Sequence, residues 1–356
     1  MKKMFLRVAF IAFAILVFGS CETEVNQTEK DLLNQETEVS DAKFGYRDDE
    51  FFLVANRGSS TFTVFDAKTT EFIQEVKLPD EGAQPTYLAH SRRNNSVYIG
   101  DFASSKVLYY DADSFELKGE IEIEEGAFHM WINNRVNQLW INNIVSKSTS
   151  VIDLKSNTVI KNIPLPVDEI PELTENAEQH DVTISPSGYA AYVTVLDGPD
   201  RSYVVMYNTQ TLEYIKHEVV GGDAHLLPVG SKLYVPAQND NSVTVFSRFN
   251  LDKLGVIPFN SAHGVANSRR FVLTTGIADN KIGVIGRNNN SVISEINTDF
   301  NTPHNLAVNK RGNIVFLSHS GGTATKVVFY QLRINGTLRK ISDFDSGLNP
   351  FGVLRY

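Results

Sequence analysis

The sequence has one cysteine among its 356 residues, Cys21, and it lacks the short motifs of the common catalytic sites. One cysteine cannot form an intramolecular disulfide. There is no G-x-S-x-G nucleophile elbow, no H-E-x-x-H zinc motif and no G-x-x-x-x-G-K-[ST] phosphate loop. These absences argue against the commonest hydrolases, metalloproteases and nucleotidases. They leave open an enzyme whose catalytic residues follow no local pattern, although we expect a binding protein.

The sequence also lacks an apolar run long enough to span a membrane, which takes about 20 residues. Its longest run, Val8 to Phe18, follows Lys2, Lys3 and Arg7. This order is typical of a signal peptide, here residues 1–20. The following Gly-Ser-Cys resembles a lipobox, which implies that Cys21 carries the lipid anchor. The alternative is an ordinary cleavage site beside an unmodified cysteine.

Positive charge is scarce once the signal peptide is removed. Residues 1–20 carry three basic and no acidic residues, so the remainder has 30 basic and 42 acidic residues and a net charge of −12. Nucleic acid is therefore excluded as a partner, and so is adhesion to anionic lipid without an anchor. Residues 21–50 are polar and acidic, as in a lipidated flexible tether. Glu22 and Glu24 resemble the export signals of Bacteroidota-type surface lipoproteins, which implies an outer-membrane protein at the cell surface or, otherwise, facing the periplasm.

Residues 51–356 contain seven copies of a unit of about 44 residues, a period typical of β-propeller blades. Each unit alternates apolar and polar residues over three strands, as in FFLVANRGSSTFTVFDAKTTEFIQEVKL. A further short strand precedes every unit except the first, and FGVLRY at the C-terminus has no unit after it. The sequence therefore predicts an all-β domain, a single seven-bladed propeller of four-stranded blades. We expect the C-terminal strand to complete the N-terminal blade.

The segments YVTV, SVIDLKSNTVIKNI and TISPSG resemble the YVTN-repeat propellers. The resemblance extends over the repeats and implies the propeller fold. It implies no single function, because that family is functionally mixed.

Five histidines recur where consecutive repeats enter their innermost strand, in AFHMW, EQHDV, DAHLL, SAHGV and TPHNL. The other two repeats have Thr86 and Phe351 there. Innermost strands line the central channel of a propeller, so we expect one ring of side chains at its mouth. A sixth histidine lies in the loop SHSGGTAT on the same face. The candidate metal ligands are His129, His180, His225, His263, His304 and His319.

Converging neutral imidazoles favour copper or zinc, and Asp181, Asp223 and Glu178 are placed to orient the rings. Alternatives are another ligand at the ring, or a purely structural role repeated in each blade. The ring resembles the histidine-lined propeller of nitrous oxide reductase. That enzyme needs a second copper domain with paired cysteines, which this chain lacks.

The acidic segment from Pro164 to Gln179 is an insertion, and it predicts either a cation-concentrating lid or a solvated loop. Polar loop residues on the same face are further candidates or simple turn caps: Arg57, Asp101, Phe102, Asn142, Asn143, Asp197, Arg201, Asn239 and Asp240.

We therefore expect a lipid-anchored extracytoplasmic protein that captures copper, zinc or a metal-containing nutrient. One alternative is a cobalamin-capturing surface lipoprotein that works with an outer-membrane transporter. Another is a metal-assisted propeller lyase or hydrolase, and a third is an interaction scaffold.

Overall fold

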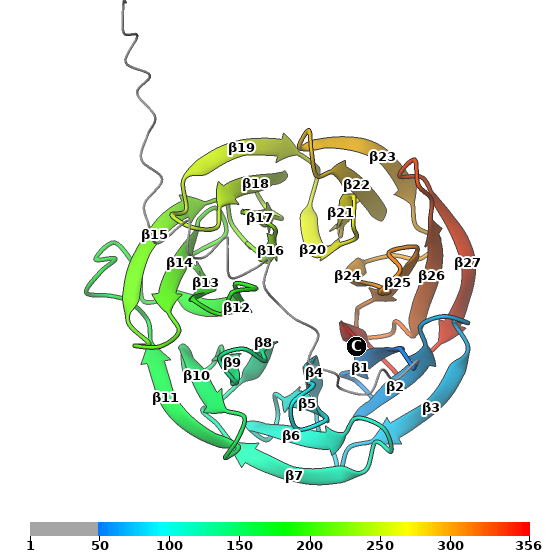
Figure 1. The fold of residues 1–356 in the computed structure, drawn as a ribbon, viewed down its shortest axis with the longest axis horizontal. Helices are drawn as coiled ribbons and strands as arrows, with labels where there is room; N and C mark the ends of the chain where they lie inside the picture. The colour runs from blue at the N-terminus through cyan, green and yellow to red at the C-terminus, as the bar shows by residue number, and fades with distance from the viewer. Residues whose placement is uncertain (1–48) are drawn as a thin grey trace, which may run out of the picture. The chain divides into compact units, whose positions relative to one another are not determined.

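The computed structural model describes residues 49–356, which form seven four-stranded antiparallel sheets arranged in a ring (Figure 1). The predicted seven-bladed β-propeller is confirmed. The signal peptide, Cys21 and almost all of the tether predicted for residues 21–50 lie outside the described residues. Within residues 49–356 no helix is long and apolar enough to span a membrane.

Each blade contributes one strand to each of four concentric positions (Figure 1). The innermost strands are β4 (Pro85–Ser91), β8 (Ala127–Asn133), β12 (Glu178–Ile184), β16 (Leu227–Val229), β20 (Ala262–Asn267), β24 (Pro303–Val308) and β28 (Pro350–Arg355). The second strands are β1 (Phe51–Asn56), β5 (Ser96–Asp101), β9 (Gln138–Asn143), β13 (Ala190–Leu196), β17 (Lys232–Ala237), β21 (Phe271–Gly276) and β25 (Ile314–His319). The third strands are β2 (Thr61–Asp66), β6 (Lys106–Asp111), β10 (Ser148–Asp153), β14 (Ser202–Asn208), β18 (Ser242–Ser247), β22 (Lys281–Gly286) and β26 (Lys326–Leu332). The outermost strands are β3 (Phe72–Lys77), β7 (Leu117–Glu122), β11 (Thr158–Pro164), β15 (Tyr214–Val220), β19 (Lys253–Pro258), β23 (Ser291–Asn297) and β27 (Leu338–Asp345).

The Asp or Asn that ends the third strand in the best-matched repeats has a local structural role. In the first blade, Asp66 Oδ1 accepts hydrogen bonds from the backbone N–H groups of Lys68 and Thr69, both at 2.7 Å. Asp111, Asp153 and Asn208 bond their own turns in the same way. This Asx turn fixes the hairpin that leads to the outermost strand. The recurring Asp or Asn therefore stabilises a turn and does not indicate a binding function.

The C-terminal strand closes the ring. β28 pairs antiparallel with β1, with Leu53 opposite Leu354 and Val54 opposite Val353. Phe51 and Tyr356 also exchange two backbone hydrogen bonds, of 3.0 and 3.2 Å. The first blade is thus built from both ends of the propeller sequence, as predicted.

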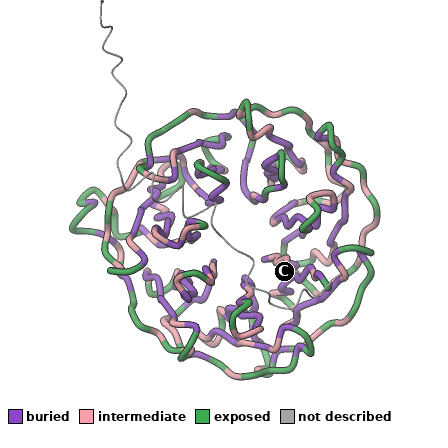
Figure 2. Tube along the Cα trace, in the orientation of Figure 1, coloured by how far each residue is buried: buried purple, intermediate pink, exposed green. Residues whose placement is uncertain are grey.

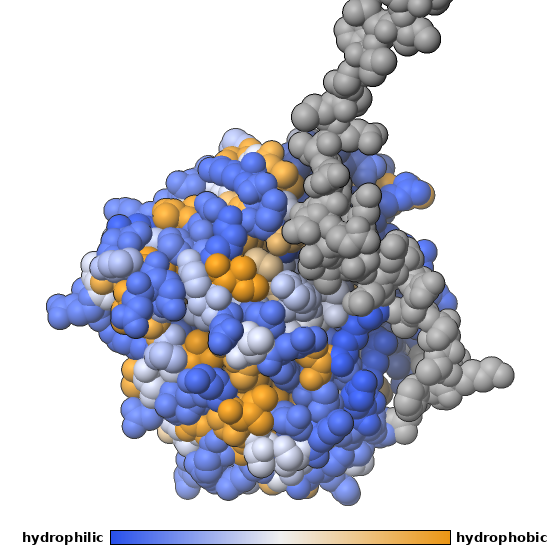
Figure 3. All heavy atoms as spheres, turned by 60° about the vertical axis from the view of Figure 1, so that its left-hand side comes forward, coloured by the Kyte–Doolittle hydropathy of each residue, from blue (hydrophilic) through white to orange (hydrophobic). Residues whose placement is uncertain are grey.

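The hydrophobic core is divided among the spaces between neighbouring blades, where apolar faces pack together. Buried residues are concentrated on the inner strands of each blade and exposed ones on the periphery (Figure 2). Phe52 and Phe65 of the first blade, for example, pack against Phe316 of the last, with ring centroids 5.2 and 5.5 Å apart. The outermost strands instead alternate exposed and half-buried residues. Their exposed apolar side chains, such as Ile160 and Val219, are interspersed with hydrophilic ones on the rim (Figure 3).

Candidate metal centre

Six of the seven innermost strands carry a β-bulge at the same level, where one extra residue interrupts pairing with the second strand. Bulges re-aim side chains and are frequent beside functional sites. The N–H group of the second bulge residue, left without a strand partner, bonds a hydroxyl of the second strand in three blades. Asp181 donates to Thr194 Oγ1, Gly264 to Thr275 Oγ1 and Asn305 to Ser318 Oγ.

The strand register corrects the predicted ring in one respect. The first bulge residues are Thr86, Phe128, His180, His263, His304 and Phe351, and the second are Tyr87, His129, Asp181, Gly264, Asn305 and Gly352. His129 therefore does not occupy the same repeat position as the other histidines, because Phe128 does. It lies one residue further along its strand, at the level of Asp181. Aligning the repeats on histidine concealed this offset.

Asp181 joins two of the imidazoles. His129 Nδ1 lies 3.0 Å from Asp181 Oδ1, and His225 Nδ1 lies 3.5 Å from Oδ2. The same carboxylate accepts the backbone N–H groups of Val182 at 2.7 Å and Leu226 at 2.8 Å. Asp181 is buried together with His129 and His225. It is therefore a fixed acceptor that orients both rings and leaves their Nε2 atoms facing elsewhere.

A second carboxylate, Asp223, lies on the other side of this group. Its Oδ1 is 3.6 Å from His225 Nε2 and 3.7 Å from His180 Nε2. Two sets of side chains have ligand atoms within 4.8 Å of one another: His129, His180 and His225, and Asp223, His225 and His263. The predicted orienting role of Asp181 and Asp223 agrees with these contacts. Glu178 makes no contact of this kind among the described residues.

Ring contacts continue the cluster around the axis. The centroids of His225 and His263 are 4.1 Å apart, and those of His263 and His304 are 4.8 Å apart. Aromatic rings flank the histidine cluster at both ends. The ring centroid of Phe351 lies 4.3 Å from that of His304, and Tyr87 stacks on His129 with centroids 3.7 Å apart. Five of the six predicted histidines therefore lie together.

The sixth, His319, is placed apart from them. Its Nδ1 bonds the carbonyl oxygen of Asn301 at 2.8 Å, and its ring packs against Phe300. His90 and His217, which the sequence analysis left out of the site, also lie elsewhere. His90 stacks on Tyr356, and His217 bonds the hydroxyl of Tyr214.

Several buried imidazole nitrogens have no hydrogen-bond partner among the described residues. They are His129 Nε2, His180 Nδ1 and both ring nitrogens of His263, whereas His225 Nε2 faces Asp223 Oδ1 at 3.6 Å. A buried polar atom left unpaired costs about 1–3 kcal/mol. Several such atoms in one cluster are a feature that a bound metal ion would explain, because each histidine that faces the ion would offer one of its nitrogens as a ligand.

Burial and local charge give these histidines different protonation states. Burial, with the neighbouring His225 and His129, lowers the pKa of His180 to about 3. Burial also lowers the pKa of His263 well below its ordinary value and that of His304 to about 3. For His225 the effect of burial is outweighed by the neighbouring carboxylates of Asp181 and Asp223, at 3.5 and 3.6 Å, which raise its pKa to about 9. Neutral imidazoles, the form that binds metals, therefore surround one protonated ring, His225, which would have to release its proton to become a ligand.

The buried neutral histidines predict acid sensitivity. The pKa is lowered to about 3 for His180 and His304, and to about 4 for His90 and His319, in each case first by burial. In the unfolded chain these rings take up protons near pH 6.5, so the unfolded state binds more protons as the pH falls. Each ring then costs up to about 1.4 kcal/mol per pH unit between pH 6.5 and about 4.

We therefore expect the free energy of unfolding, measured with urea and EDTA, to fall by several kcal/mol from pH 7 to pH 5. His225 works in the opposite direction, since its contribution is complete below pH 6.5 and is lost as the pH rises through about 9. Equal unfolding free energies at pH 5 and 7 would contradict the prediction.

The polar loop residues on the histidine face act mainly within their own loops. Asp101 Oδ1 accepts the N–H groups of Gln84 and Ala103, and Asn143 bonds Ser148 and Ser150. Arg57 is the exception near the ring, since its guanidinium lies over Phe102 and Phe351, at 4.7 and 5.4 Å. The turn-cap interpretation holds for Asp101 and Asn143.

The acidic insertion is attached to its own blade. Ile170 and Ala177 are buried in the core between β8–β11 and β12–β15, whereas Asp168, Glu169, Glu172 and Glu175 are exposed. None of these acidic residues contacts the histidine cluster. This arrangement fits the solvated loop better than the lid.

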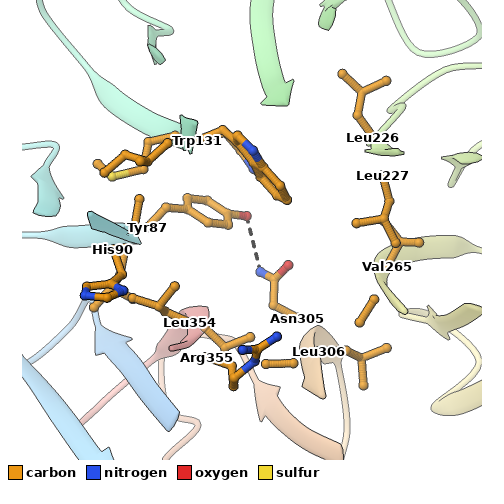
Figure 4. A pocket seen from close by; sticks show the side chains of 18 of the residues that line it. Tyr87, His90, Trp131, Leu226, Leu227, Val265, Asn305, Leu306, Leu354 and Arg355 are labelled. Carbon is orange, nitrogen blue, oxygen red and sulfur yellow. Dashed lines mark hydrogen bonds between the residues drawn. The ribbon is translucent and has the colours of Figure 1, made fainter. Parts of the chain in front are cut away.

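A cavity of about 580 Å³ occupies the central channel on the other side of the cluster (Figure 4). Its inner end is formed by Tyr87, His129, Asp181, His225 and Asn305. It extends along the innermost strands to Arg92 and Asn134, which belong to the hairpins between innermost and second strands. No pattern in the sequence predicts this cavity. The bulge register shows that Tyr87 and Asn305 line the cavity at the level of His129.

Comparisons with known proteins agree on the fold. Residues 34–187, fewer than half of the chain, match the DUF5128 family model, described as a 6-bladed β-propeller. No curated protein matches the sequence significantly. A solved periplasmic gluconolactonase of Pseudomonas aeruginosa is similar, with 13% identity and a TM-score of 0.68 over 86% of this chain and 99% of that one.

Two further solved structures extend this pattern. A protein from Lactobacillus plantarum has 14% identity and a TM-score of 0.68 over 86% of this chain and 99% of that one. Hydrazine synthase of Kuenenia stuttgartiensis has 13% identity and a TM-score of 0.62 over 80% of this chain and 90% of that one. At such identities the similarity establishes the propeller fold and not the chemistry.

Proposed function

We propose that this protein binds a transition-metal ion, copper or zinc, through His129, His180 and His225. The observation that carries the proposal is the convergence of these imidazoles, with ligand atoms within 4.8 Å of one another, around ring nitrogens that lack other partners. Bonds of about 2.0–2.1 Å in a tetrahedral site put ligand atoms about 3.3 Å apart. Small side-chain rotations would close the difference.

The carboxylates support a metal site over a purely structural ring. A histidine ligand usually donates its second ring N–H to a carboxylate, which fixes the ring and increases its basicity. Asp181 stands in this relation to both His129 and His225. His263 and Asp223 are the candidates for a fourth ligand, because each lies within ligand distance of His225.

The biological setting is part of the same proposal. The protein would be held at the outer membrane through a lipid on Cys21 and would capture its metal, or a metal-containing nutrient, outside the cytoplasm. An affinity for cobalamin and a transporter partner is the variant of this proposal to test next. The resemblances to YVTN-repeat propellers and to the histidine-lined propeller of nitrous oxide reductase are compatible with it, and neither assigns the ligand.

One observation favours a second candidate, a metal-assisted hydrolase or lyase. His129 and His225 also line the cavity of about 580 Å³, and Asp223 lies within reach of His225. A metal at these histidines could therefore meet an organic molecule in the channel and activate a water or polarise a carbonyl group. Metal binding is common to both candidates, so it is tested first.

The test is a zinc and copper titration of the chain from Glu22 onward, purified in EDTA and then freed of chelator. We expect one tightly bound ion per chain, and we expect the double variant His129→Ala/His180→Ala to lose at least 100-fold in affinity. His217→Ala is the matched control, because His217 lies on outermost strand β15 and should leave binding unchanged. Equal affinities in all three proteins, or no binding, would refute the metal site.

A further inference from the structure

The central channel has its own chemistry, separate from the metal ligands at its inner end. Its lining runs from Tyr87 on β4 to Arg92 just beyond that strand, five residues further on, so the cavity is about 16 Å deep at 3.3 Å per residue. A volume of about 580 Å³ lies within the usual range of small-molecule pockets, roughly 300–1,000 Å³. The channel fits a ring system.

The wall of the channel is apolar. Each of the six bulged innermost strands contributes the residue that follows its bulge, including Leu88, Met130, Val182, Val265 and Leu306. Trp131 adds an indole that lies across the channel from Asn305 and Arg355 (Figure 4). Such a wall binds the apolar body of a ligand, and the indole provides a flat surface for stacking.

The outer end of the channel is cationic. Arg92 and Arg355 both line it, and the guanidinium of Arg92 makes no hydrogen bond to a described residue. Arg355 Nε donates to the carbonyl oxygen of Val308 at 3.2 Å and lies 3.7 Å from Glu50. The field of both arginines reaches His90, whose pKa is lowered to about 4 by burial and then by Arg92 and Arg355. Among the side chains of the described lining residues the one carboxylate, Asp181, is at the opposite end, and Glu50 offsets part of the charge of Arg355 from outside the lining.

The inner end offers a hydrogen-bond donor. Asn305 Nδ2 donates to the hydroxyl of Tyr87 at 3.2 Å, so the Tyr87 proton remains available (Figure 4). Burial raises the pKa of Tyr87 well above 10, which keeps this proton in place at neutral pH. An oxygen atom of a ligand at this depth would accept it.

From this arrangement we propose that the channel binds an organic carboxylate with an apolar ring system. The carboxylate lies between Arg92 and Arg355, the rings lie against Trp131 and the aliphatic wall, and the far end reaches Tyr87. Guanidinium groups are suited to carboxylates because they present paired N–H donors. The site needs no metal, so it stands whether or not the histidine cluster binds one.

The experiment uses 1-pyrenebutanoate as the probe and the neutral 1-pyrenebutanol as its matched analogue. Both are titrated into the EDTA-treated chain from Glu22 onward, and binding is followed by energy transfer from tryptophan to pyrene. We expect saturable binding of the carboxylate at least 10-fold tighter than that of the alcohol. Equal affinities for the two probes would overturn the proposal.

Three variants locate the site. Arg92→Gln/Arg355→Gln should weaken the carboxylate at least 10-fold and change the alcohol less than two-fold. Val265→Trp should block both probes by filling the channel. Arg93→Gln is the matched control, since Arg93 is on the same hairpin, bonds the carbonyl oxygen of Asn134 and does not line the cavity. An Arg93→Gln loss as large as that of the double variant, or unchanged binding in Val265→Trp, would refute the site.

Discussion

Replacing Asp181 by Asn is expected to lower the affinity for zinc or copper 10- to 100-fold and to destabilise the protein at the same time. Asp181 accepts two backbone N–H groups and faces the Nδ1 atoms of His129 and His225. Burial alone would raise its pKa, but the two histidines more than offset this and hold the pKa below its usual range. An amide cannot orient both rings, and it removes the charge that balances a protonated His225. Loss of an orienting carboxylate typically costs this much in metal affinity.

Stability should fall by about 3–5 kcal/mol in Asp181→Asn, as when one partner of a buried ion pair is removed. Urea unfolding in EDTA measures this loss, and chelator competition measures the affinity. Asp197→Asn is a suitable control, because Asp197 is a buried carboxylate bound to Thr174 and Arg201, in a loop outside the histidine cluster. It should lower stability and leave metal affinity intact. An unchanged affinity in Asp181→Asn would remove the orienting role.

Deletion of residues 350–356 is expected to abolish the folded monomer, the largest effect predicted for this chain. It removes β28, leaves the edge of β1 unpaired and takes Val353 and Leu354 from the cores beside the first blade. An exposed sheet edge with an apolar face promotes aggregation. Size-exclusion chromatography and circular dichroism should show aggregated protein with no cooperative unfolding transition.

A circular permutant tests whether the ring needs β28 itself or only needs its two ends to be covalently separate at this position. Phe51 and Tyr356 are hydrogen-bonded neighbours, so a short Gly-Ser linker can join them, with new ends placed in the loop between β27 and β28. This protein keeps all four strands of the first blade and should unfold cooperatively near the wild-type temperature. A soluble, cooperatively folding deletion variant would show that the ring does not depend on β28.

Much of the fold could be predicted from the sequence because each blade repeats the same strand and turn signals. Alternation of apolar residues defines the strands, and the Asp or Asn at the end of the third strand specifies its turn, as in Asp66 and Asp153. The unmatched strand at Phe351 required a partner, and the unit at Phe51 lacked one. Pairing of these two segments followed from counting alone.

The site could be predicted only in part. The repeats brought together His180, His225, His263 and His304, because equivalent positions on innermost strands must meet at the axis. The offset of His129 could not be predicted, since a bulge adds one residue and identical residue types in neighbouring repeats hide it. His319 was misplaced for another reason. It is the last residue of β25 rather than part of the loop, and its ring turns to Asn301 and Phe300.

The amino-acid sequence by itself determined the ring of seven blades, its closure by the C-terminal strand and the gathering of histidines near the axis. These follow from periodicity, which is local information repeated seven times. Only the tertiary structure decided which ring nitrogens meet Asp181 and Asp223, and that a channel with arginines at its far end lies on the other side. These depend on bulge register and on side chains from different blades, at distances that no repeat pattern encodes.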